Sequence, residues 1–160
     1  MKPLPRRARQ HGIAAIELAL ILSLSLFLLP YILLFGRVFW HYTALQKAAH
    51  DAARYMSTLP QQEMGNVASA AAAATLARTM VSDAALGAGL TERPETALIT
   101  VNCITATNVV LTCGGVNLPA MVQVTFEVNI RDDVWNMFTA VYTGQDGIPL
   151  TLTATLRYVP

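Results

Sequence analysis

A long apolar segment near the N-terminus constrains this chain more than any other feature. Between Gly12 and Gly36 the only charged residue is Glu17. Residues 13–35 would form roughly 34 Å of helix at about 1.5 Å per residue. The hydrocarbon core of a bilayer is about 30 Å thick. The segment is therefore predicted to be a transmembrane helix covering residues 13–36.

The charges that precede this segment predict its orientation. Four of the 11 Lys and Arg residues are Lys2, Arg6, Arg7 and Arg9, and residues 1–12 contain no acid. Basic flanks of a membrane span stay in the cytoplasm, so the rest of the chain is expected outside. The net charge of the whole chain is only +1, which argues against nucleic-acid binding because no basic face is available for phosphates.

Glu17 needs an explanation, because it lies inside the apolar segment. A carboxylate at the bilayer centre costs about 2.5 kcal/mol or more, and less near the interface. Either it has a functional partner, or it lies close enough to the membrane surface to be solvated. In the second case the protein is simply anchored by an uncleaved signal segment.

The helix is predicted to continue past the membrane, to about residue 58, because a stripe of apolar positions alternates in steps of four and three. Leu59-Pro60 ends it, since a residue before proline avoids the α region. The stripe packs either on the protein's own domain or on a neighbouring subunit. It consists of Val38, Tyr42, Leu45, Ala49, Ala52 and Met56.

The remaining residues, 37–160, are predicted to form one extracytoplasmic α+β domain. An Ala-rich second helix is expected over Gln61–Val81, followed by a loop over 82–96. Alternation of apolar and polar residues then predicts roughly four antiparallel strands with one solvated face. The expected strands are Leu98–Ile104, Asn108–Thr112, Val122–Ile130 and Leu150–Tyr158, with a short amphipathic helix over Val134–Tyr142.

The two cysteines, Cys103 and Cys113, lie in the part of the chain expected outside the cytoplasm, where disulfides persist. A disulfide closing a short loop is the favoured interpretation. Two buried free thiols are the first alternative. A metal site is the least favoured, because two cysteines without further ligands do not complete a tetrahedral shell.

No catalytic constellation is predicted, and neither a cofactor nor a metal is expected. His41 and His50 lie nine positions apart on one predicted helix, which is not a metal-ligand spacing. They are explained as polar residues on the helix surface. Ser23 lies in the apolar segment, where its hydroxyl is expected to bond to the helix backbone. Asp132 and Asp133 are adjacent and are better explained as a helix start than as a general acid–base pair.

The N-terminal residues form a motif. A basic leader ending in Gly12, four apolar residues from Ile13 to Ile16, and then Glu17 resemble the class III signal of type IV pilins and pseudopilins. The resemblance implies that a prepilin peptidase cuts after Gly12, so that residues 1–12 are a cleaved leader and Ile13 is the new N-terminus. It also implies that Glu17 pairs with the Ile13 amine of a neighbouring subunit in a filament.

Two further stretches narrow the resemblance. Residues Ala44–Tyr55, after such a helix, and the terminal Pro149–Leu156 resemble TadE-like minor pseudopilins of Tad/Flp (type IVb-like) pilus systems. This implies a pilin-like fold and a single-pass protein of the bacterial inner membrane, with a cytoplasmic N-terminus and a periplasmic domain. The implied partners are the prepilin peptidase, other pilins and pseudopilins, and the Tad assembly platform.

Two alternatives remain open. One is a single-span, signal-anchored envelope protein whose outer domain binds a ligand or a partner. The other is a pseudopilin of a type II secretion system. It would share the leader cleavage and the role of Glu17 but would belong to a secretion system instead of a pilus.

Overall fold

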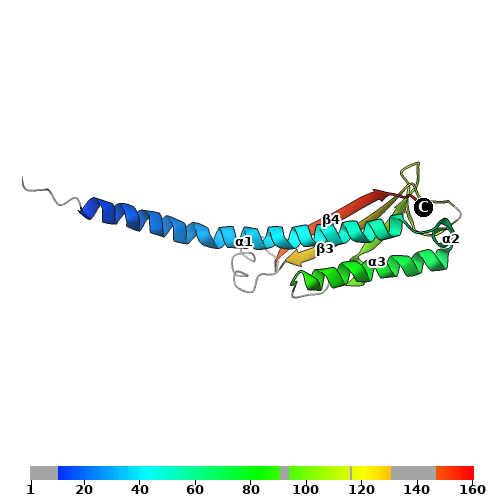
Figure 1. Ribbon diagram of the computed structural model, residues 1–160, viewed down its shortest axis with the longest axis horizontal. Helices are drawn as coiled ribbons and strands as arrows, with labels where there is room; N and C mark the ends of the chain where they lie inside the picture. Colours follow the sequence, from blue (N-terminus) through cyan, green and yellow to red (C-terminus); the bar gives the residue numbers. More distant parts are fainter. Residues whose placement is uncertain (1–10, 91–93, 116, 131–146) are drawn as a thin grey trace, which may run out of the picture. The chain divides into compact units, whose positions relative to one another are not determined.

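The computed structural model describes residues 11–90, 94–115, 117–130 and 147–160, and the chain divides into two compact units after Arg37. Helix α1 (His11–Ser57) contributes to both units (Figure 1). Pro30 lies inside α1 and does not end it. The predicted long helix is therefore confirmed. The predicted helix Val134–Tyr142 and the first ten residues of the leader lie outside the described residues.

The second helical region is two helices, and the prediction of one helix over Gln61–Val81 is wrong. Helix α2 (Gln61–Met64) ends before Gly65, and α3 (Val67–Gly87) begins after Asn66. The Asn66 side chain accepts a hydrogen bond of 2.9 Å from the backbone N–H of Ala68. This N-cap satisfies one of the free donors at the start of α3, so the chain begins a new helix there.

Helix α3 also extends further than predicted. It runs to Gly87, so the connection to the sheet is shorter than the loop expected over 82–96, and it contains a 3₁₀ turn, η1 (Thr96–Leu98). Gly89 follows with φ +84°, a left-handed conformation in which glycine avoids the steric cost of a side chain. The Ala-rich end of α3 favours helix until this glycine is reached.

Four strands form one antiparallel sheet, as the sequence predicts, and the structure places them in the order β2-β1-β3-β4. Their bounds are β1 (Thr100–Ile104), β2 (Val110–Thr112), β3 (Met121–Ile130) and β4 (Ile148–Arg157). In the register, Val101 pairs with Val124 and Val124 pairs with Ala154. Since paired residues share a face, the apolar positions of the three longer strands lie on the same side of the sheet.

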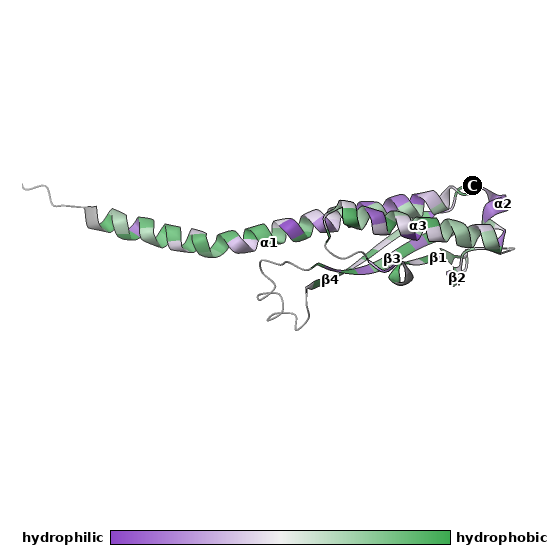
Figure 2. Cartoon of the chain, turned by 90° about the horizontal axis from the view of Figure 1, so that it is seen from below, coloured by the Kyte–Doolittle hydropathy of each residue, from purple (hydrophilic) through white to green (hydrophobic). Residues whose placement is uncertain are grey.

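The domain core lies between this apolar face and the helices. Figure 2 shows α3 and the later part of α1 on one side of the sheet. The opposite face is polar and carries threonine pairs, including Thr125 and Thr153, whose hydroxyls are 3.2 Å apart. The buried positions of the two long strands are Val122, Val124, Phe126, Val128, Ile130, Leu152 and Ala154.

The later part of the α1 stripe belongs to this core. Leu45, Ala49, Ala52 and Met56 are fully buried and cluster with α3 and the sheet. Tyr42, by contrast, is 41% exposed. The structure therefore decides between the two predicted roles of the stripe: from Leu45 onward it packs on the protein's own domain.

The C-terminus is tied to the end of α1. The Val159 N–H donates to the Ser57 carbonyl at 3.0 Å, and the Tyr158 hydroxyl donates to the Leu59 carbonyl at 2.8 Å. Burial raises the pKa of Tyr158, which keeps this hydroxyl a protonated donor. The last strand is thus held against the point where the long helix stops.

One buried hydroxyl gives a stability prediction. Ser82 in α3 is fully buried, and its Oγ has no hydrogen-bond partner among the residues described. An unsatisfied buried hydroxyl costs free energy, so Ser82→Ala is expected to raise the free energy of unfolding by about 1 kcal/mol. The measurement is thermal or denaturant unfolding of the full chain in detergent.

Ser69→Ala is the matched control on the same helix. The Ser69 Oγ donates to the Glu63 carbonyl at 2.7 Å, so this substitution is expected to lower stability by about 1 kcal/mol. Equal effects of the two substitutions would contradict the explanation.

Candidate functional site

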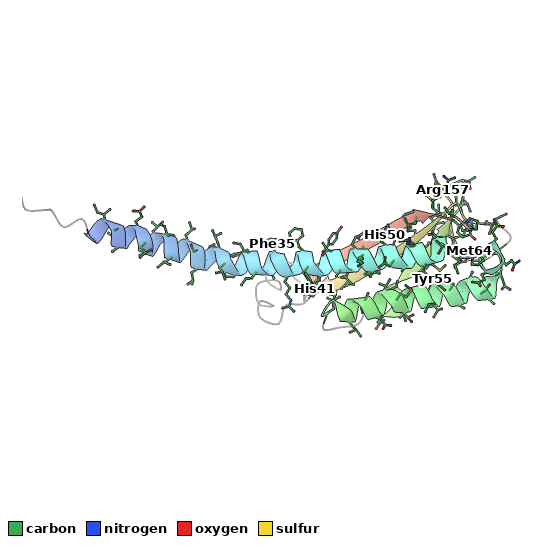
Figure 3. The ribbon with its side chains drawn as sticks, viewed as in Figure 1. Phe35, His41, His50, Tyr55, Met64 and Arg157 are labelled. Atoms are coloured by element: carbon green, nitrogen blue, oxygen red, sulfur yellow. A yellow bond between two sulfur atoms is a disulfide. The ribbon has the colours of Figure 1, made fainter. Side chains whose placement is uncertain are left out.

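The first unit contains an apolar helix surface that the described chain leaves uncovered. Large side chains between Ile13 and Phe35 are exposed, including Ile13 at 74% and Leu26 at 78%. Side chains project from this part of α1 in several directions (Figure 3), and its residues are predominantly hydrophobic (Figure 2). The helix is long and apolar enough to cross a membrane, and it fits a membrane anchor.

The predicted processing site lies at the very start of this helix. Gly12 and Ile13 are in the first turn of α1, which begins at His11. Glu17 follows Ile13 by four residues, so the two lie on the same face one turn apart.

Glu17 is the single acidic group on this surface. Its side chain is exposed, and no residue within the described ranges forms a hydrogen bond or an ion pair with it. The residues around Glu17 are apolar. Together with Glu17 they line a shallow groove, and they are Ile13, Ile16, Leu20 and Ile21. In an apolar medium this carboxylate would need a cationic or hydrogen-bonding partner from outside the described chain, or access to the membrane surface.

The polar and aromatic groups along α1 also fit a membrane anchor. The Ser23 hydroxyl donates a hydrogen bond to the Leu20 carbonyl at 3.0 Å, as expected, so the helix backbone satisfies this donor. Trp40, just beyond the apolar run, is 68% exposed. Exposed tryptophans are typical of the interface between lipid and water.

The histidines differ from expectation in one respect. His50 is exposed, but His41 is only 4% exposed, so the prediction that His41 is a polar residue on the helix surface is wrong (Figure 3 labels both). His41 lies one turn before Leu45, the first fully buried stripe residue, and this spacing was the signal for its burial. In the described part of the chain no group of three His, Cys, Asp or Glu residues is placed to hold a metal.

The predicted disulfide between Cys103 and Cys113 is confirmed, with a Cα–Cα distance of 5.0 Å. Cys103 lies in β1, and Cys113 directly follows β2. The bridge thus connects β1 to the start of the segment that leaves β2. Gly114, the next residue, has φ +105° and approaches α3 so closely that an added Cβ would lie 2.9 Å from the Val67 Cα.

Comparison with known proteins gives one match. Residues 12–54 match the model of the TadE-like protein family, which covers most of α1 and stops before α2. This confirms the resemblance to TadE-like proteins predicted from the sequence. No curated protein and no solved structure matches the chain.

Proposed function

We propose that this protein is a minor pseudopilin that takes part in the assembly of a Tad-type pilus. In this proposal a prepilin peptidase cuts after Gly12, and the mature chain starts at Ile13. The domain has no catalytic role; it is a structural part that meets other pilins, pseudopilins and the assembly platform. The single observation that carries the proposal is an unpartnered Glu17 on an uncovered apolar helix within the stretch that matches the TadE-like family.

The physical logic concerns where Glu17 finds a partner. Cleavage after Gly12 creates an α-ammonium group on Ile13, one helical turn from the carboxylate. In a bundle of such helices, the ammonium of one subunit can pair with Glu17 of the next in a medium of low dielectric constant. A charge that is costly in the membrane then becomes a stabilising contact in the assembly.

The same proposal gives the location. Lys2 and the three arginines hold the N-terminus on the cytoplasmic side of the inner membrane. The domain after α1 then lies in the periplasm, an oxidising compartment that suits the Cys103–Cys113 disulfide.

Processing is the first test. Mass spectrometry of the intact protein from cells with the peptidase is expected to show an N-terminus at Ile13, and from cells lacking it an N-terminus at Met1. Gly12→Val is expected to leave the leader on, because a branched side chain at the cleaved position obstructs the peptidase. Gly36→Ala, in the same helix and with nothing near its Cα, is the control and should be processed normally.

An intact Met1 N-terminus in peptidase-positive cells would contradict the proposal. It would favour a signal-anchored envelope protein, in which the leader stays attached and Glu17 has no assembly role. A chain that is processed but absent from Tad complexes would favour a pseudopilin of a secretion system.

A further inference from the structure

The sheet has two outer edges, and their strands run in opposite directions. Within the described ranges β2 and β4 are the outer strands, and every neighbouring pair of strands is antiparallel. β2 therefore points the same way as β3 and opposite to β4. A second copy in the same orientation can then place its β4 beside β2 as an antiparallel neighbour. Two copies in one orientation also carry their apolar helices through a membrane in the same sense.

The outer edge of β2 offers the backbone groups of two residues. The Thr105 N–H donates to the Val109 carbonyl at 3.0 Å, so Val109 and, by alternation, Leu111 direct their backbone groups toward β1. Val110 and Thr112 therefore direct theirs outward, where none of the described residues bonds to them. The strand also exposes apolar surface, because Val110 is 54% exposed and Leu111 is 49% exposed.

In β4 the odd-numbered residues face outward. The Tyr158 N–H donates to the Ala120 carbonyl at 3.0 Å, in line with the register in which Arg157 pairs with Met121. Hydrogen-bonded pairs alternate along an antiparallel ladder, so the even-numbered residues of β4 bond to β3. The odd-numbered residues direct their N–H and C=O groups to the outer edge.

Only part of this edge has every outward group open. Pro149 has no N–H, and the Thr153 carbonyl already accepts a hydrogen bond of 3.2 Å from the Gln46 side chain of α1. Beyond that bond, Thr155 and Arg157 are both exposed, and their outward groups have no partner among the residues described. The open part of the β4 edge thus has two residues, as the β2 edge has.

The register of the sheet aligns these two pairs of residues. Two rows of paired residues cross the sheet, and each row links an outward residue of β2 to an outward residue of β4. The rows are Val110, Ile104, Met121 and Arg157, and Thr112, Asn102, Gln123 and Thr155. Residues in one row share a face. A second copy placed beside β2 without a shift along the strands therefore brings Arg157 opposite Val110 and Thr155 opposite Thr112, with only the ordinary twist between strands.

We propose that β2 of one copy pairs with β4 of a second copy of this chain in this register. Thr112 beside Thr155 continues the threonine pairs that the polar face already has within the domain. The apolar stem of Arg157 covers Val110. Each copy keeps one open β2 and one open β4, so the contact is heterologous and can repeat. It requires neither leader cleavage nor a pilus.

Cysteine cross-linking tests the pairing in the full chain in its membrane. Two differently tagged copies are co-expressed, one with Val110→Cys and the other with Arg157→Cys, and are oxidised briefly. Opposite residues of a hydrogen-bonded antiparallel pair have Cα atoms about 5.5 Å apart, which a disulfide can span. The cross-linked heterodimer is expected in about tenfold or greater excess over that from Val110→Cys with Thr151→Cys, because Thr151 lies further along β4, beyond disulfide reach. Peptide mapping checks that the Cys103–Cys113 bridge is retained.

Proline substitutions give the second measurement. The Thr155 N–H faces outward, so Thr155→Pro removes a donor to the neighbouring copy and no backbone hydrogen bond within the sheet. It is expected to lower the yield of the cross-link several-fold. Thr151→Pro is the matched control, because it removes an outward donor of the same strand outside the proposed pair, and it should leave the yield unchanged. Thermal unfolding in detergent checks that both variants fold.

The pairing is overturned if Val110→Cys cross-links no better to Arg157→Cys than to Thr151→Cys. It is also overturned if each cysteine variant cross-links mainly to its own kind, which indicates two-fold pairing of like edges, or if the two proline variants lower the yield equally. The uncleaved Gly12→Val chain should give the same cross-links, so a failure of processing and a failure of this pairing are distinguishable.

Discussion

Glu17→Ala is expected to leave membrane insertion intact and to reduce the amount of surface pili by more than about tenfold. In the membrane pool Glu17 has no partner within the described chain, whereas in the proposed assembly it pairs with an Ile13 amine. Pairing of the wild-type carboxylate therefore stabilises the assembled state relative to the membrane pool. An alanine cannot form this pair, so its assembled state lacks that stabilisation. A lost difference of only about 1.4 kcal/mol per subunit already corresponds to a factor of ten.

The measurement is an immunoblot of the major pilin in sheared pili, together with the membrane level and N-terminus of the variant. Ile21→Ala is the matched control, because Ile21 lies one turn further along the same face and lines the groove around Glu17. It is expected to assemble nearly normally. Wild-type piliation with Glu17→Ala would remove the pairing explanation, whereas loss of the protein from the membrane would show that Glu17 acts at insertion instead.

Gly114→Ala is expected to destabilise the domain by about 2–5 kcal/mol. Two costs add at this position: a side chain at φ +105°, and a Cβ placed 2.9 Å from the Val67 Cα and 3.1 Å from the Ala70 Cβ. Strain of an ordinary residue in a left-handed conformation costs about 1–2 kcal/mol, and overpacking typically costs about 1–3 kcal/mol. Since a backbone atom is the obstacle, the contact cannot be relieved by a side-chain rotation.

Substitutions at two other glycines distinguish the cost of backbone strain from the cost of overpacking. Gly89 has φ +84° but open space around it, so Gly89→Ala should show the strain alone, about 1–2 kcal/mol. Gly87 lies at the end of α3 with open space and no positive φ, so Gly87→Ala should be neutral or slightly stabilising. Thermal unfolding of the full chain in detergent ranks the three variants. A Gly114→Ala variant no less stable than Gly89→Ala would show that the segment after Cys113 does not pack on α3 as described.

Several features follow from local sequence and were predictable without the fold. The apolar run that contains Glu17 is long enough to cross a bilayer, and its length alone predicts a membrane anchor. Strict alternation along Val122–Ile130 predicts a strand with one buried face, and the structure buries those five apolar residues. The proline after Leu59 ends the long helix wherever the rest of the chain lies.

Other features depend on contacts between residues distant in sequence. The break at Gly65-Asn66 is an exception, because it is local: Asn66 caps the backbone N–H of Ala68, and a glycine followed by asparagine was a signal for it that the prediction missed. The burial of His41 depends on its being one turn from Leu45 once α1 is covered by its own domain. The approach of Gly114 to Val67 has no local signal, since it joins two segments that only the fold brings together.

The sequence alone thus predicted a long apolar helix with a single carboxylate, an antiparallel sheet of about four strands, and a Cys103–Cys113 disulfide as the favoured of three interpretations. These predictions depend on the spacing of apolar residues, the length of the apolar segment, the positions of charges and the even number of cysteines. All of these are read directly from the sequence. Only the tertiary structure decided that the α1 stripe from Leu45 onward packs within the domain, whereas most large side chains between Ile13 and Phe35 are exposed. The physical reason is that burial requires two surfaces in contact, and a local segment of sequence specifies only one of the two surfaces.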